Sequence, residues 1–254
     1  MLTAFTPIDV GTIDLDYAKL DKWYEENTEP MSSTLADGKA SKLTIIPVRE
    51  YTDDFEFTDP IDLYHRKYFY ELNWKWRDDF IKEFPEVDEF CKRLPFKKIT
   101  IGFLLGKHQK LLTLHQDSSE YYMGRHNLPI EDFDSIYFER EWGQTRRKEQ
   151  PISEYRIVLR PDEKEGPMSF FMKPSKGEVA EFGVETKDHS NVDHVTMPKD
   201  ASAFGLTQRW VMHGSDPCDK ILLTISGELD LEAHDELVAR SISKYKDYVL
   251  QYDL

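Results

Sequence analysis

The chain has few cysteines and no long apolar segment. Its 254 residues include two cysteines, Cys91 and Cys218, which do not form a C-x-x-C pair. Two isolated cysteines support neither a disulfide framework nor a zinc ribbon, so we expect a reducing, cytoplasmic environment. The first residues have no basic segment followed by an apolar one, and no stretch is long enough to span a bilayer. We therefore expect no secretion signal and no membrane partner.

Positive charge is also scarce. The chain has 33 Lys and Arg residues against 48 Asp and Glu residues, which gives a formal net charge of −15. An acidic surface repels phosphate backbones, so we expect no nucleic-acid partner. Hydrophobic residues make up 39% of the chain and charged residues 32%, the profile of a globular protein that buries a substantial core.

Short apolar segments at regular spacing follow residue 96. They cover residues 99–105, 110–115, 155–160, 168–172, 192–197, 203–206, 208–212 and 220–225. Short strands at this spacing predict an antiparallel barrel or jelly roll. The connection at 106–109 predicts a hairpin between the first two strands. A further strand is predicted at 43–48, where Pro47 favours an edge position because proline cannot donate a ladder hydrogen bond.

The N-terminal third favours helices. Residues 14–26 have the apolar spacing of a short amphipathic helix. The aromatic-rich stretch 60–94, which includes Trp74 and Trp76, favours two more helices, divided at Pro85. The first would be capped by Asp59 and begin at Pro60.

Together these segments predict a mainly β protein in three parts. Residues 1–95 form a helical N-terminal elaboration that packs on the core. Residues 96–230 form the β core, with a polar insert at 118–153 that has few strand patterns. Residues 231–254 form the C-terminal helix, with its helical pattern at 231–249.

Two predicted strands end in candidate metal ligands. Side chains at positions i and i+2 of a strand share one face, so His115 and Asp117 can offer a nitrogen and a carboxylate oxygen to one ion. Gln116 is then turned away. His213 ends another apolar segment and can supply the third ligand. Two histidines and one carboxylate on one side of a metal form the facial triad of non-haem Fe(II) oxygenases, which leaves positions open for a co-substrate and O2.

A simpler interpretation also fits the triplet. The chain has eight histidines, and a surface strand with a polar pair at 115–117 needs no metal. However, the apolar segments 111–114 and 210–212 run directly into the two candidate histidines. Two such coincidences favour a metal site at the mouth of a barrel.

This order of features resembles the Fe(II)/2-oxoglutarate-dependent oxygenases, and most of all the aspartyl/asparaginyl β-hydroxylase and proline 3-hydroxylase group. The resemblance covers about residues 96–230 and implies a double-stranded β-helix core of the jelly-roll, cupin-like type. It implies Fe(II) bound by His115, Asp117 and His213, with 2-oxoglutarate as co-substrate and O2 as oxidant. The implied activity is a dioxygenase that hydroxylates an unactivated C–H bond. Its substrate would be an amino acid or a prolyl, aspartyl or asparaginyl residue of a protein.

The resemblance also implies a buried cation for the distal carboxylate of 2-oxoglutarate. It puts a basic residue on the strand after the last histidine, and Lys220 is the candidate. Arg156 and Arg160 on an earlier strand can share or replace this role, and a guanidinium suits a carboxylate better than an ammonium does. Thr224 shares a strand face with Lys220 and can add a hydroxyl hydrogen bond.

Two other classes of function fit parts of the sequence. A cupin-like metal enzyme without 2-oxoglutarate usually has three or more histidines close together. Here His194 is the best substitute for His213 because it too lies in a predicted strand, whereas His234 is expected on the surface or in a loop. A non-catalytic β-sandwich that binds a ligand through its aromatic residues would need no metal. The fold alone does not separate these classes.

Overall fold

The computed structural model describes residues 2–28, 33–34, 40–41, 44–52, 73–108, 112–115, 155–161, 169–172, 192–206, 212–215 and 218–252. This part of the chain is mainly β, in antiparallel sheets. Asp117 and the whole predicted insert at 118–153 lie outside the described residues.

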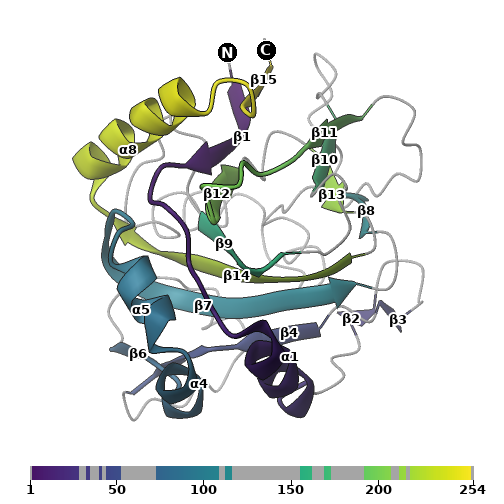
Figure 1. The fold of residues 1–254 in the computed structure, drawn as a ribbon, viewed down its shortest axis with the longest axis vertical. Coiled ribbons are helices and arrows are strands. Elements are labelled where there is room, and N and C mark those ends of the chain that lie inside the picture. Colours follow the sequence, from purple (N-terminus) through teal and green to yellow (C-terminus); the bar gives the residue numbers. More distant parts are fainter. Residues whose placement is uncertain are drawn as a thin grey trace, which may run out of the picture.

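The larger sheet has seven strands, in the order β15 (Leu250–Tyr252), β1 (Leu2–Ile8), β12 (Ala203–Leu206), β9 (Tyr155–Arg160), β14 (Cys218–Leu229), β7 (Phe96–His108) and β4 (Thr44–Pro47). The smaller sheet has the order β11 (Asp193–Val195), β10 (Ser169–Met172), β13 (Met212–Ser215) and β8 (Leu112–His115). Two short pairs complete the strands: β2 (Ser33–Thr34) with β3 (Ala40–Ser41), and β5 (Arg49–Tyr51) with β6 (Trp74–Trp76). Figure 1 shows the long β7 and β14 side by side at the centre.

The described helices are α1 (Tyr17–Glu26), α4 (Asp78–Glu83), α5 (Pro85–Cys91) and α8 (Leu231–Lys244). Asp16 starts α1 by accepting a hydrogen bond from the Lys19 amide at 3.1 Å, and Asp230 does the same for Ala233 in α8 at 3.3 Å. Pro85 stands at the first turn of α5, where its missing N–H costs nothing. No helix in this described part is both long enough and apolar enough to cross a membrane.

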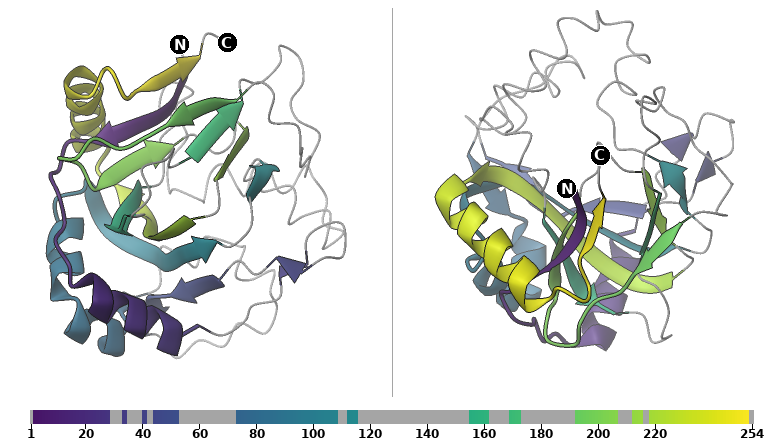
Figure 2. Two further views of the ribbon diagram at one scale, coloured as in Figure 1. Left: turned by 45° about the vertical axis from the view of Figure 1, so that its right-hand side comes forward. Right: turned by 90° about the horizontal axis from the view of Figure 1, so that it is seen from above.

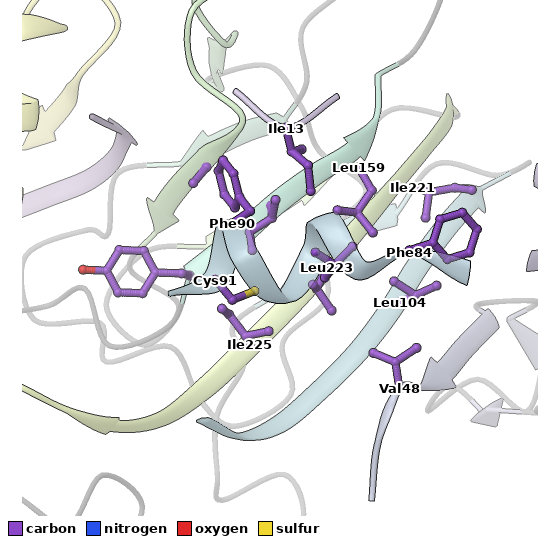
Figure 3. Close-up of a cluster of buried hydrophobic side chains, with 14 of the residues drawn as sticks. Ile13, Val48, Phe84, Phe90, Cys91, Leu104, Leu159, Ile221, Leu223 and Ile225 are labelled. Atoms are coloured by element: carbon purple, nitrogen blue, oxygen red, sulfur yellow. The ribbon is translucent and has the colours of Figure 1, made fainter. Parts of the chain in front are cut away.

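One face of the larger sheet packs against the helices. Alternate residues of β14, namely Ile221, Leu223 and Ile225, are fully buried there. Leu104 of β7 and Phe90 of α5 belong to the same cluster (Figure 3). This alternation follows from the two-residue period of a strand and makes the helix-covered face the main hydrophobic core.

The other face of the larger sheet meets the smaller sheet. A second apolar cluster contains Leu222 and Phe204 from the larger sheet together with Val195 from the smaller one. The two sheets lie across from each other in Figure 2. The Tyr252 hydroxyl of β15 donates a 2.8 Å hydrogen bond to Asp193 of β11, which also joins the sheets. We call this space between the two sheets the inter-sheet space.

Several predicted strands are confirmed. β9 and β12 have the bounds predicted from their apolar patterns. β4 pairs only with β7 among the described strands, so Pro47 lies on an edge strand as predicted. A mainly β protein with helices in its N-terminal part is therefore confirmed at this level.

The predicted hairpin at 106–109 is wrong. β7 continues through Gly106 to His108, because this segment pairs with Ile221 and Cys218 of β14. β8 belongs to the smaller sheet, so the chain crosses from one sheet to the other instead of turning back. A long-range partner has overridden the local turn pattern.

The prediction of a helix at Trp74 and Trp76 is also wrong. Both residues lie in β6, opposite Tyr51 and Arg49 of β5. The Arg49 guanidinium stacks over the Trp76 ring at 4.8 Å and donates hydrogen bonds to the carbonyls of Trp74 and Ile99. These contacts come from residues far away in the sequence, so no local pattern indicates them.

The two ends of the chain differ from the prediction as well. α8 ends at Lys244, not at residue 249, and β15 follows it. β15 pairs with β1, which places Leu2 opposite Tyr252 at the edge of the larger sheet. The terminal segments are therefore strands of the sheet, and not only helical additions to it.

An ion-pair cluster fastens α8 to β1 and gives a pH-dependent prediction. Asp9 accepts hydrogen bonds from Lys244 at 2.7 Å and Arg240 at 3.0 Å. The Lys244 hydrogen bond, with the Arg240 ion pair, lowers the pKa of Asp9 below 3.8. A lowered carboxyl pKa contributes stability above its unfolded value, and this contribution is lost as the pH falls through the folded value.

We therefore expect Asp9→Asn to lower the free energy of unfolding at pH 7 by up to about 1 kcal/mol, because both cations are partly exposed. In urea denaturation the difference from wild type should disappear in acid, well below pH 3.8. Lys22→Ala, which removes an exposed 3.8 Å pair with Glu26, should change little at either pH. A deficit of Asp9→Asn that persists in acid would contradict the ionic explanation.

Candidate functional site

The smaller sheet brings the two candidate histidines together. β13 and β8 are antiparallel neighbours, and His213 stands directly opposite His115 in their register. Opposite positions of an antiparallel pair share one face of the sheet and have Cα atoms about 4.5–5.5 Å apart. His213 is 4% exposed, so its imidazole is buried. The structure thus pairs two positions that are far apart in the sequence.

The third predicted ligand, Asp117, lies outside the described residues. Among the residues that the structure describes, no group of three His, Cys, Asp or Glu side chains is arranged to hold a metal ion. That finding does not include Asp117, which follows two residues after the end of β8. The triad of His115, Asp117 and His213 therefore stays a prediction, with two of its positions adjacent.

Lys220 lies in the inter-sheet space beside the end of β13. It is 3% exposed, and its ammonium donates a 2.7 Å hydrogen bond to the hydroxyl of Ser215. The register between β14 and β7 shifts between Cys218 and Ile221, so Lys220 sits in a bulge. Such a bulge re-aims a side chain locally. The ammonium is held two residues along β13 from His213.

A glycine makes this local arrangement fit. A Cβ atom on Gly106 of β7 would lie 2.9 Å from the carbonyl oxygen of Lys220. Any larger residue would push the two backbones apart at the bulge. The Tyr24 hydroxyl of α1 donates a 3.1 Å hydrogen bond to the Gly106 carbonyl, which fixes this end of β7 from the helix side.

Arg156 and Thr224 form a second polar pair in the same space. They stand opposite each other on β9 and β14, one step along from the apolar partners Val158 and Leu222. Thr224 is 1% exposed, and its hydroxyl has no hydrogen-bond partner within the described residues. A buried hydroxyl without a partner is costly, because it loses its hydration and gains no hydrogen bond in exchange. The register therefore places an arginine and a threonine at opposite positions on the face of the larger sheet that meets the smaller sheet.

The Arg156–Thr224 pair and Lys220 are separate groups. Lys220 precedes Thr224 by four residues on one strand, which places their Cα atoms about 13 Å apart. The Lys220 ammonium is held toward β13 by Ser215, whereas Thr224 stands opposite Arg156 of β9. The structure therefore gives these two predicted anion-binding residues different neighbours, Ser215 for Lys220 and Arg156 for Thr224.

Arg160 does not join either group. Its guanidinium pairs with Asp21 of α1 at 2.9 Å and donates to the Asp219 carbonyl at 2.9 Å. The register between β9 and β14 shifts at Ile221, so the four-residue spacing from Arg156 no longer gives both arginines the same surroundings. Arg160 fastens β9 to α1 on the helix side of the sheet.

The sequence missed one buried polar pair close to this site. The Tyr155 hydroxyl and the Nδ1 atom of His234 are 2.7 Å apart, and both residues are buried. Burial raises the pKa of Tyr155, and the nearby Asp235 raises it further. The prediction that His234 lies on the surface or in a loop is wrong. Its helical spacing from Leu237 and Ser241, both buried on α8, was the pattern that could have indicated a buried position.

The unpartnered hydroxyl of Thr224 gives a prediction about the free protein. Thr224→Val keeps the shape of the side chain and removes the hydroxyl, so we expect the free energy of unfolding to rise by about 1 kcal/mol. Thr100 is the matched control, because it is equally buried and donates a 3.3 Å hydrogen bond to the Ser226 carbonyl. Thr100→Val should lower stability by about 1 kcal/mol. Equal losses for the two variants in chemical denaturation would show that Thr224 is already satisfied.

No protein-family model matches this chain, and no curated protein matches it. Its function must therefore be inferred from the residues and their arrangement.

Proposed function

We propose that the protein is an Fe(II)- and 2-oxoglutarate-dependent dioxygenase built on a double-stranded β-helix. The strand order supports this fold. Among the described residues, the strands from β7 to β14 fall four to each sheet, in the orders β12-β9-β14-β7 and β11-β10-β13-β8. If β7 is counted as the first strand and β14 as the eighth, these orders are 6-3-8-1 and 5-4-7-2, the pattern of an eight-stranded jelly roll.

The observation that carries the proposal is the pairing of His115 with His213. Two adjacent strands of the smaller sheet present histidines at opposite positions of one register. Asp117 follows His115 by two residues, the spacing at which a strand directs side chains to the same face. Two histidines and one carboxylate from such positions suit Fe(II) with open coordination sites.

The residues of the inter-sheet space suit a dicarboxylate co-substrate. We assign its distal carboxylate to Arg156 and Thr224, since a guanidinium and an unpartnered buried hydroxyl together meet the needs of a buried carboxylate. Phe103 and Phe204 are the cross-strand neighbours of this pair. These rings exclude water from a carboxylate bound there, which strengthens its hydrogen bonds.

Lys220 has a different role in the proposed site. Its ammonium is fixed by Ser215, on the strand that carries His213. It therefore lies nearer to the proposed metal end, and we assign it a supporting positive charge rather than the anchor.

The bound Fe(II) and 2-oxoglutarate would supply the oxidising chemistry that hydroxylates a C–H bond. The chain's own residues bind the co-substrate, hold it in one orientation and keep water out. The substrate class that we propose is an amino acid, or a prolyl, aspartyl or asparaginyl residue of a protein.

The metal site is tested by turnover of 2-oxoglutarate. We expect the purified protein to convert 2-oxoglutarate and O2 to succinate and CO2 in an Fe(II)-dependent manner, with an added reductant such as ascorbate supplying the two electrons that the substrate would otherwise give. His115→Ala, Asp117→Ala and His213→Ala should abolish this turnover. His194→Ala is the control, because His194 is exposed on β11, two strands away from β13.

Other outcomes would contradict the proposal in distinct ways. Metal binding without 2-oxoglutarate turnover would favour a cupin-like enzyme of another class. If the three substitutions change neither metal binding nor the binding of any ligand, a non-catalytic β-sandwich would be favoured instead.

The anchor assignment is tested by binding. With Mn(II) in place of Fe(II), we expect Arg156→Ala to raise the Kd of 2-oxoglutarate by at least about tenfold, because a charge-assisted hydrogen bond is lost. Thr224→Val should raise it by about two- to tenfold, although it stabilises the free protein. Isothermal titration calorimetry measures both. If Lys220→Met weakens binding and Arg156→Ala does not, the anchor is Lys220.

A further inference from the structure

Tyr155 and Arg156 are consecutive residues of β9 that face opposite sides of the larger sheet. Tyr155 is fully buried in the helix-covered core, where its ring packs edge-on against Phe96 with centroids 5.5 Å apart. Arg156 stands opposite Thr224 on the other side. Because one stretch of backbone carries both, a shift of the tyrosine moves the arginine with it.

The partner of Tyr155 belongs to the helix that follows β14. The short Tyr155–His234 contact of 2.7 Å joins β9 to the first turn of α8. α8 begins immediately after β14, which carries Thr224, and Asp230 caps this junction. The contact therefore links β9, which bears Arg156, to the end of β14, which bears Thr224.

We propose that Tyr155 and His234 are positioning residues for the carboxylate site formed by Arg156 and Thr224. This inference rests on the proposed function. The pair acts from the reverse face of the sheet and fixes β9 against the β14–α8 junction. The ladder between β9 and β14 places Arg156 opposite Thr224, and the contact fastens the end of that ladder, where Tyr155 is paired with Ile225.

A buried hydrogen bond restricts the position of β9 relative to α8 more closely than apolar packing does. Apolar contacts tolerate small sliding, whereas a hydrogen bond weakens steeply with distance and angle. If the hydroxyl of Tyr155 is removed, the ring still fills its place in the core. The position of β9 relative to α8 is then less restricted. Ligand affinity then falls because part of the binding energy is spent on ordering the site.

The alternative is that the pair only stabilises the fold. Ser241 separates the two cases, because it is an equally buried hydrogen-bonding residue of the same helix. Its hydroxyl accepts a 2.9 Å hydrogen bond from the Asp9 amide and donates a 2.6 Å one to the Leu237 carbonyl. It therefore docks α8 on the segment after β1, away from β9. Ser241→Ala destabilises the helix docking without touching the proposed linkage.

The test is calorimetric titration of 2-oxoglutarate into the full chain loaded with Mn(II). We expect Tyr155→Phe and His234→Leu each to raise the Kd of 2-oxoglutarate about fivefold. Their Kd for Mn(II) alone should stay within twofold of the wild type. His234→Asn, which keeps an acceptor near the place of Nδ1, should restore most of the affinity. Ser241→Ala should leave the Kd of 2-oxoglutarate unchanged while it lowers the thermal midpoint.

Each contrary outcome has a separate meaning. If Tyr155→Phe lowers the thermal midpoint but binds 2-oxoglutarate like the wild type, the pair is only structural and the inference fails while the proposed function stands. An equal loss of affinity in Ser241→Ala overturns it in the same way. If the wild-type protein loaded with Mn(II) does not bind 2-oxoglutarate, the proposed function fails, and the inference fails with it.

Discussion

β14 has an apolar face and a polar face, and the rest of the structure depends on each face staying on its own side of the sheet. Ile221, Leu223 and Ile225 enter the helix-covered core, while Lys220 and Thr224 enter the inter-sheet space. A slip of one residue in its pairing would exchange the faces, putting an ammonium into the main core and an isoleucine into the proposed site. The long ladders with β7 and β9 fix the register on both sides.

The polar residues of the inter-sheet space are costly for the fold. Lys220 is almost completely buried, and Thr224 has an unpartnered hydroxyl in the described part of the structure. A buried unsatisfied group costs about 1–3 kcal/mol, so a chain selected only for stability would carry apolar residues at such positions. Local rules of protein stability are broken mainly where a ligand compensates for them. This cost is the reason why we assign the proposed carboxylate to Thr224 and its neighbour Arg156.

Local patterns in the sequence predicted several core strands well, but they missed β1, β6 and β15 and predicted the pairings poorly. β9 was predicted residue for residue, because one short segment from Tyr155 to Arg160 has a strand pattern and is closed by Pro161. The pairing of Arg160 with Asp21 could not be predicted, because the two residues are 139 positions apart and nothing local distinguishes this arginine from Arg156. Strand order, the crossing from β7 to β8 and the joining of the termini depend on the same kind of long-range contact. The facing of His115 and His213 was expected only because the chemistry of a metal site requires it.

The C-terminal segment, which was predicted from the sequence to lie outside the β core, is held to the sheets at three points. His234 contacts Tyr155 of β9, Lys244 pairs with Asp9 after β1, and Tyr252 bonds Asp193 of the smaller sheet. The first of these lies behind Arg156 and the last spans both sheets. If the segment only covered an apolar face, Leu237 and its neighbours would suffice, because burial has no direction. Hydrogen bonds at fixed positions instead restrict how the strands lie relative to one another. The end of the chain is therefore better explained as part of the framework that aligns the two sheets than as a cover for one of them.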